Sequence, residues 1–126
     1  HYNSCNVLSL HALLGAYSDE GAQWLDELRP VLADNIRYAC DFIAAHFPGV
    51  QVMQPQGTYM LFLDCAAWLQ EHHMTLRELE ERGARAGVIW QDGAAFAWPD
   101  SIRMNLALPH SRLVEAMERL RVHAFC

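Results

Sequence analysis

The spacing of apolar residues changes at Phe47-Pro48-Gly49, and this change divides the 126-residue chain into two unlike parts. Before this point, apolar residues recur every three or four positions, as on one face of an α-helix. After it, short apolar runs of strand length alternate with amphipathic helical segments. Pro48 and Gly49 favour a turn at the junction. The pattern predicts a helical segment at residues 1–47 and an α+β domain at residues 48–126.

Two helices are expected in the first part. One spans residues 6–17, and three polar side chains, Asn3, Ser4 and Asn6, are available to cap its start. The second is long, and Pro30 lies inside it. Because proline removes a backbone donor, Pro30 is expected to bend this helix or mark a junction. The second helix has an apolar stripe at helical spacing, formed by Trp24, Leu25, Leu28, Leu32, Ile36, Ala39, Phe42 and Ile43.

The second part alternates strands and helices. Strands are expected at residues 50–53, 58–63, 88–90 and 102–106, and helices at 66–70, from 75 to about 83–87, and after Pro109. The run 58–63 is almost wholly apolar, which is typical of a central strand covered on both faces. Thr75 and Glu78 match a capping box, and the final helix carries Leu113, Met117 and Leu120 on one face. This order predicts a small, mostly antiparallel sheet with helices on one face.

Composition and charge exclude several classes of partner. The chain is 52% hydrophobic and 19% charged, its formal net charge is −6, and all nine of its basic residues are arginines. An acidic chain without basic clusters is poorly suited to bind nucleic acid or an anionic membrane. No apolar run reaches the length of a membrane span. We therefore expect neither a nucleic-acid nor a membrane partner.

The cysteines and histidines indicate no metal site. The cysteines are widely and irregularly spaced and form no C-x-x-C pair: Cys5, Cys40, Cys65 and Cys126. This spacing predicts reduced thiols in a cytoplasmic protein rather than a disulfide framework. The adjacent residues His72 and His73 would point in different directions on a helix or strand, so they form a poor chelate.

Residues 101–111 place an arginine on a short strand that leads into a helix. Arg103 alternates with apolar neighbours, and Pro109 then ends the strand. Such an arrangement can hold a guanidinium rigidly at the strand end, where it can grip a carboxylate through two parallel hydrogen bonds. Arg103 can equally be a surface arginine in an exposed ion pair, which contributes little to stability. The residues alone leave both interpretations open.

Three motifs follow one another along the second part: GTYMLFLD at residues 57–64, VIWQDGAAF at 88–96 and RMNLALP at 103–109. They resemble, in order, the G-T-Y-x-x-W-L-D, V-x-x-x-P-G-x-x-F and R-L-N-x-A-x-P segments of the C-terminal small domain of class I and II aminotransferases. These are pyridoxal-phosphate enzymes of fold type I. The resemblance is greatest to the carbon–sulfur lyase branch related to cystathionine β-lyase. It extends upstream through the two helices and covers nearly the whole chain.

The resemblance implies a function for Arg103. In the family, the matching arginine holds the α-carboxylate of the amino-acid substrate while pyridoxal 5'-phosphate acts on the α-carbon. Asn105 is expected to satisfy backbone groups near the strand end, Tyr59 to contribute packing, and Gly57 to permit a turn. We assign no catalytic or cofactor-binding residue. The chain contains no lysine, and the family's Schiff-base lysine lies in a large domain upstream.

The resemblance therefore implies a C-terminal fragment that is inactive alone. Its expected partners are its own large domain, a second subunit in a homodimer, and an amino-acid substrate. The parent reaction would be α,β-elimination from a sulfur-containing amino acid, with transamination as the alternative. Asp92 replaces a family proline, and Ala97 and Trp98 replace a stretch that often contains glycine, so both changes are expected to bear on specificity.

A second interpretation belongs to a different class of protein. Residues 48–126 can form a free-standing α+β module that senses a ligand or binds a protein, with Arg103 holding an effector carboxylate and no catalysis. The long amphipathic helix within residues 1–47 argues against this interpretation, because its apolar stripe needs a partner surface.

Overall fold

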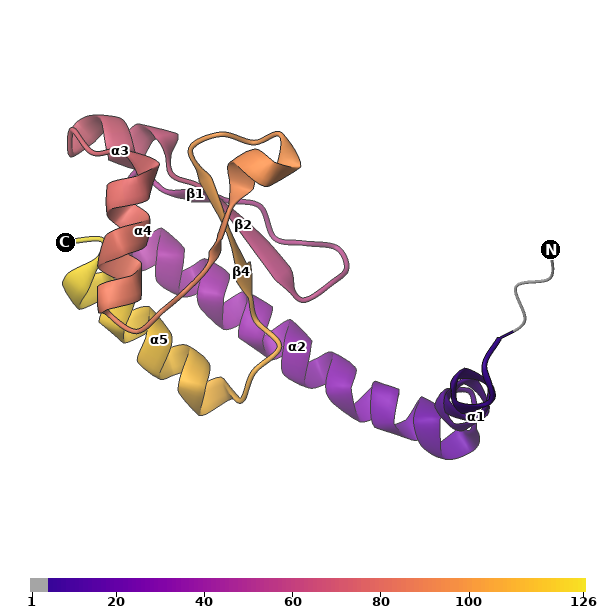
Figure 1. Ribbon diagram of the computed structural model, residues 1–126. Helices are drawn as coiled ribbons and strands as arrows, with labels where there is room; N and C mark the ends of the chain where they lie inside the picture. The colour runs from indigo at the N-terminus through magenta and orange to yellow at the C-terminus, as the bar shows by residue number, and fades with distance from the viewer. Residues whose placement is uncertain (1–4) are drawn as a thin grey trace. The chain divides into compact units, whose positions relative to one another are not determined.

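A computed structural model describes residues 5–126, and the chain forms two compact units that divide between Val31 and Leu32. The first unit contains α1 (Val7–Ala16) and the start of α2 (Asp19–His46). The second contains the rest of α2 and all later elements (Figure 1). These elements are β1 (Gln51–Val52), β2 (Met60–Asp64), α3 (Ala66–Glu71), α4 (Leu76–Arg85), β3 (Gln91–Asp92), the 3₁₀ helix η1 (Gly93–Phe96), β4 (Ser101–Asn105) and α5 (His110–His123).

The predicted boundary at residue 47 differs from this division because the second half of α2 belongs to the core of the second unit. Ile36, Ala39, Phe42 and Ile43 of its apolar stripe are buried. Pro30 lies inside α2, which continues through it as one helix, and the division between the units falls just beyond it.

Local capping signals operate in both units. The side chain of Asn6 accepts a hydrogen bond from the Ser9 amide at 2.8 Å, as expected for the start of α1. The other two predicted caps, Asn3 and Ser4, lie outside the described residues. At the start of α4, Thr75 and Glu78 form the predicted capping box.

The sheet has the strand order β1-β2-β4-β3, and every neighbouring pair is antiparallel. This confirms the predicted small antiparallel sheet. The predicted strand at residues 88–90 is wrong, because pairing begins only at Gln91, opposite Arg103. The amide of Val88 is instead bonded to the carbonyl of Gly83 at 2.9 Å, so this segment follows the end of α4 before it reaches the sheet.

The helices leave one face of the sheet open, and α2 and α5 lie along the other (Figure 1). Alternate side chains of β2 and β4 point to opposite faces. Those on the helical side are buried: Leu61, Leu63, Ile102 and Met104. Met60, Phe62 and Asp64 on the other face are only half-buried. The expectation that β2 is covered on both faces is therefore wrong for the described residues.

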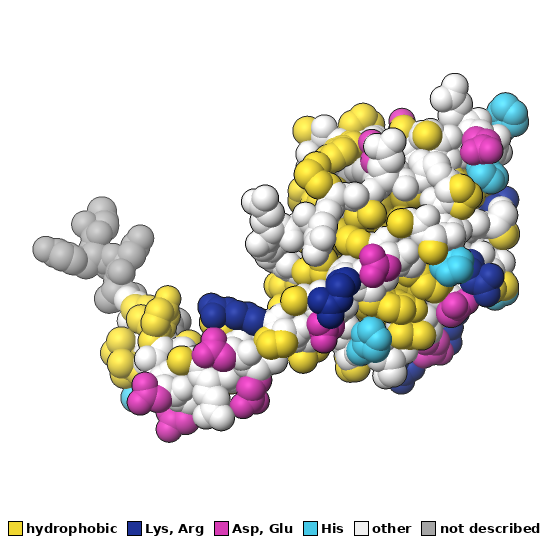
Figure 2. Space-filling view, turned by 180° about the vertical axis from the view of Figure 1, so that it is seen from behind, with side chains coloured by type: hydrophobic (Ala, Val, Ile, Leu, Met, Phe, Trp, Pro, Cys, Tyr) yellow, Lys and Arg dark blue, Asp and Glu magenta, His cyan; other side chains and the backbone are white. Residues whose placement is uncertain are grey.

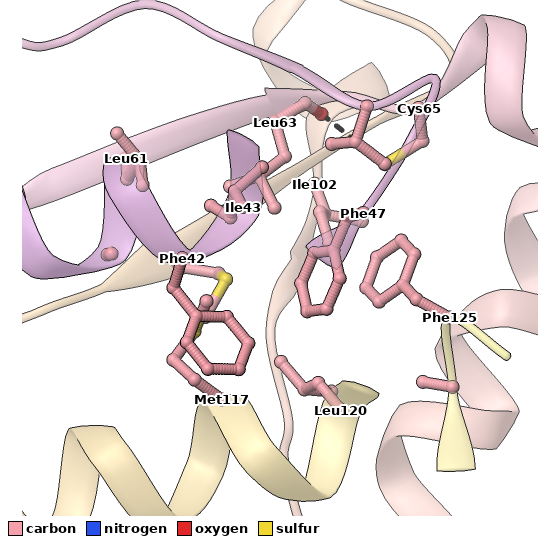
Figure 3. Close-up of a cluster of buried hydrophobic side chains, with 14 of the residues drawn as sticks. Phe42, Ile43, Phe47, Leu61, Leu63, Cys65, Ile102, Met117, Leu120 and Phe125 are labelled. Carbon is pink, nitrogen blue, oxygen red and sulfur yellow. Dashed lines mark hydrogen bonds between the residues drawn. The ribbon is translucent and has the colours of Figure 1, made fainter. Parts of the chain in front are cut away.

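The core joins α2, the sheet and the C-terminal helix (Figure 3). Phe47 stacks on Phe125 with ring centroids 4.2 Å apart. On α5, the predicted apolar face of Leu113, Met117 and Leu120 is buried, which confirms that part of the pattern. Among residues 5–126, no helix is both long enough and apolar enough to cross a membrane.

Candidate functional site

Arg103 lies in the middle of the sheet, on the face that the helices leave open. It pairs with Phe62 of β2 on one side and with Gln91 of β3 on the other. Its neighbours in β4, Ile102 and Met104, point into the core and are buried. Arg103 is therefore held by strands on both sides rather than at a strand end, which fixes its backbone more firmly than the sequence predicts.

Among residues 5–126, the guanidinium of Arg103 contacts an aromatic ring and forms no ion pair with a carboxylate. Its central carbon lies 4.2 Å from the centroid of the Phe96 ring. Its Nε is buried and has no hydrogen-bond partner among the described residues. Seven other arginines form ion pairs with carboxylates on their own helices: Arg29, Arg37, Arg77, Arg85, Arg112, Arg119 and Arg121. Arg103 takes part in none of these pairs, so its charge is available to a ligand.

Phe62, Phe96 and Trp98 form a group of three rings on the open face, which we call the aromatic cluster. The Phe62 and Phe96 rings meet edge to face at 5.6 Å, and the Phe62 and Trp98 rings stack at 6.1 Å with 15° between their planes. Edge-to-face and stacked pairs are favourable arrangements of aromatic quadrupoles. The cluster thus holds the Phe96 ring, over which the Arg103 guanidinium lies, in place.

The loop that carries Phe96 is closed by its own hydrogen bonds. The Asp92 carboxylate accepts from the Ala94 amide at 2.7 Å and so caps η1. The Ser101 hydroxyl donates to the Trp98 carbonyl at 2.7 Å. At Gly93, any side chain would overlap Ser101, so the close approach requires glycine. Asp92, which stands where the family has proline, thus has a structural function in this loop.

Asn35 of α2 fastens the segment that follows β4. Its side-chain nitrogen donates to the carbonyls of Leu106 and Leu108, both at 2.9 Å. Its side-chain oxygen lies 2.9 Å from Nδ1 of His110, which must donate because the oxygen can only accept. No sequence motif pointed to Asn35. The available signal was a polar residue beside Ile36, inside the apolar stripe of α2.

The other predicted residues have mixed outcomes. Asn105 accepts a hydrogen bond from the Ala107 amide at 2.8 Å, as expected of a structural residue. Tyr59 is 41% exposed and is not among the side chains packed on the core, so its predicted packing is wrong for the described residues. Gly57 has no positive φ and open space around it. The left-handed position in this turn is Thr58, at φ 69°.

The four cysteines lie in the described residues and are all free. Cys65 is buried, and this burial, together with the nearby Asp64 and Asp100, raises the pKa of its thiol to about 12. A thiol with so high a pKa is a poor nucleophile and a poor metal ligand at neutral pH. The structure thus gives Cys65 a packing function.

The chain resembles known proteins over most of its length. Residues 1–120 match the family model for aminotransferase class I and II. Protein MalY of Escherichia coli K12 is 33% identical over 122 residues, which cover 94% of this chain and 30% of MalY. Cystathionine beta-lyase PatB of Bacillus subtilis 168 is 28% identical over 119 residues, which cover 92% of this chain and 30% of PatB.

Solved structures show the same fold. The pyridoxal-phosphate-bound C-S lyase of Staphylococcus hominis matches with a TM-score of 0.84 and 25% identity, over 97% of this chain and 32% of that one. The chain therefore spans about 30% of the length of the curated relatives that it matches.

Proposed function

The chain belongs to the class I and II aminotransferase family, and on this basis we propose that it is the C-terminal small domain of a longer pyridoxal-phosphate-dependent enzyme. Its similarity to MalY and PatB, and the small-domain fold, confirm the resemblance seen in the three sequence motifs. The proposed parent reaction is α,β-elimination from a sulfur-containing amino acid, with transamination as the alternative. The similarity to PatB, a cystathionine beta-lyase, supports elimination.

The position of Arg103 carries this proposal. Its guanidinium lies on the open face of the sheet, outside the ion pairs of the described residues, and its backbone is fixed by strands on both sides. A planar guanidinium offers two parallel N–H groups that match the two oxygens of a carboxylate. In the proposed function, Arg103 binds the α-carboxylate of the substrate and so fixes the orientation of the amino acid.

The residues of this chain do not fit covalent attachment of the cofactor. Pyridoxal phosphate, when bound, supplies an electron sink for chemistry at the α-carbon, and enzymes of this kind hold it through a lysine. The chain contains no lysine. We therefore place cofactor binding in another part of the parent protein. The function proposed for this segment is to bind and orient the substrate. The segment by itself is proposed to be inactive.

Exposed apolar side chains on the N-terminal unit support partners beyond this chain. Figure 2 shows hydrophobic side chains on the surface of this unit. They include Val7, Leu8, Leu10, Leu13, Leu14, Tyr17, Trp24, Leu25 and Val31. Apolar surface of this extent marks an interaction site. We propose that the large domain and a second subunit cover it, in a homodimeric cytoplasmic enzyme whose free thiols suit a reducing compartment.

Substitution of Arg103 in the full-length holoenzyme tests the proposal. Arg103→Ala removes two charge-assisted hydrogen bonds to the substrate, so KM for L-cystathionine should rise by at least about 100-fold. Arg103→Lys should recover only part of the loss, since an ammonium cannot form the parallel pair. Arg112→Ala, which removes an arginine exposed on α5, is the control and should leave KM unchanged. Unaltered saturation kinetics in Arg103→Ala would refute the proposed role.

A further inference from the structure

We propose that Phe96 is a positioning residue for carboxylate recognition: its ring face holds the Arg103 guanidinium in the orientation that receives the substrate. This inference rests on the proposed function of Arg103. It assigns to Phe96 an effect on ligand affinity that goes beyond packing of the loop.

The contact between the two side chains has the geometry that such a function needs. The central carbon of the guanidinium lies over the Phe96 ring, 4.2 Å from its centroid. A cation in this position is attracted by the negative face of the ring. All five N–H groups of a guanidinium point outward in its own plane. A contact through the flat face therefore uses none of these donors, and the terminal N–H groups can donate to a carboxylate.

The ring itself is held in place. Phe96 is the last residue of η1, which is capped by Asp92 and followed by Ala97 in the left-handed conformation at φ 59°. Phe62 contacts the Phe96 ring edge to face from the neighbouring strand β2. The loop and the sheet thus fix the Phe96 ring from two sides, while 44% of the residue remains exposed.

No carboxylate of the described residues forms an ion pair that holds the Arg103 guanidinium in place. A paired carboxylate would hold the guanidinium equally well, but it would occupy the donors that the substrate needs and compete with it. The aromatic face stabilises the charge without accepting those hydrogen bonds. The Nε of Arg103 is buried and lacks a hydrogen-bond partner among the described residues, so the N–H groups proposed to meet the carboxylate are the terminal ones. Before substrate arrives, Phe96 limits the rotamers that Arg103 visits, and this lowers the entropy cost of binding.

The test compares Phe96→Leu with the unmodified full-length holoenzyme. The probe is 3-(methylthio)propionate, which has a carboxylate but no amino group to react, and its affinity is measured by titration calorimetry. Leucine retains apolar bulk and removes the π face, so Kd should rise about ten-fold, the scale of one cation–π contact. The neutral 3-(methylthio)propionamide should bind equally to both proteins. KM for L-cystathionine should rise similarly, with kcat changed less than two-fold or so.

Two further variants separate positioning from general structure. Phe96→Tyr keeps the ring and should restore the affinity for the carboxylate. Phe125→Leu makes the same substitution in the buried core, where it should lower the unfolding midpoint but leave the Kd of the probe unchanged. Equal loss of affinity for the carboxylate and for the amide, or equal effects of Phe96→Leu and Phe125→Leu, would overturn the inference.

The outcome also distinguishes this inference from the proposed function. If Arg103→Ala weakens the probe and Phe96→Leu does not, Arg103 binds the carboxylate without help from Phe96, and only the inference fails. If neither variant changes the Kd, the proposed function of Arg103 fails as well.

Discussion

At the scale of single residues, environment rather than residue type determines what a side chain does. Most arginines of this chain lie on helix surfaces and pair with a carboxylate three or four residues away. Such exposed pairs contribute little to stability. Arg103 has the same chemistry but lies on a central strand against an aromatic ring, and for that reason we propose it as the arginine that binds a ligand. The Cys65 thiol is a second example, because its burial raises its pKa and makes it a poor nucleophile.

Stability at alkaline pH should depend on Cys65. Its pKa is raised from the ordinary 9.0 to about 12 by burial and by Asp64 and Asp100. Between these values the unfolded chain has lost the thiol proton while the folded chain keeps it, so the free energy of unfolding falls as pH rises from about 9 to about 12. The slope from this group is at most about 1.4 kcal/mol per pH unit.

Urea denaturation between pH 8 and 11 measures this dependence. Cys65→Ala should show a shallower decline than the unmodified chain, whatever its stability at neutral pH. Tyr38 and Cys40 also have raised pKa values, because burial disfavours their charged forms, but they contribute equally to both proteins. Identical slopes would mean that the Cys65 thiol titrates normally in the folded chain.

At the scale of elements, side-chain contacts fix how the helices meet the sheet. Asn35 links α2 to the backbone after β4, across more than 70 residues of sequence. The segment after α4 is positioned by packing rather than by hydrogen bonds from a side chain, because Trp90 packs on Gly83. A side chain at Gly83 would overlap the Trp90 ring. This glycine lies inside α4, where helix propensity alone would favour alanine.

Two glycine substitutions with opposite effects test the packing of α4. Gly83→Ala should destabilise the chain by about 1–2 kcal/mol, because the overlap with Trp90 outweighs the gain in helix propensity. Gly15→Ala in α1 is the matched control. It has no atom within 4 Å of the added methyl group and should stabilise α1 by up to about 1 kcal/mol. Denaturant unfolding gives both values. A stabilising Gly83→Ala would show that Trp90 is free to move away.

At the scale of the whole molecule, the chain corresponds to part of a longer enzyme of its family. Its sequence matches about 30% of the length of its curated relatives. This chain carries Arg103 and no lysine. In the proposed function, the group that orients the substrate and the group that holds the cofactor come from different domains. In the proposed function, this domain orients the substrate and is inactive without the large domain.

The isolated chain should therefore fail to bind pyridoxal phosphate through a side chain. Pyridoxal phosphate is added in modest excess. The absorbance of bound cofactor should not exceed that of a control peptide with a free N-terminus, because the chain has no lysine. Borohydride reduction followed by mass spectrometry of peptides should locate any adduct at the N-terminal amine. An adduct elsewhere would show that another group of this chain attaches the cofactor.

The sequence by itself determined the local features of this protein. Apolar spacing predicted the buried part of α2 and the buried face of α5, and residue identity predicted the capping box and the Asn105 contact. These signals depend on neighbours a few residues away, so they survive without knowledge of the fold. The three motifs, in order, also indicated the family and drew attention to Arg103.

The tertiary structure alone decided which distant groups meet. It placed Phe96 against Arg103, Asn35 against two carbonyls after β4, and Trp90 against Gly83. It also left one face of β2 uncovered and moved the pairing of β3 to Gln91. No local sequence pattern predicts these contacts, because each depends on which side-chain shapes and hydrogen-bonding groups fit together once the sheet has formed.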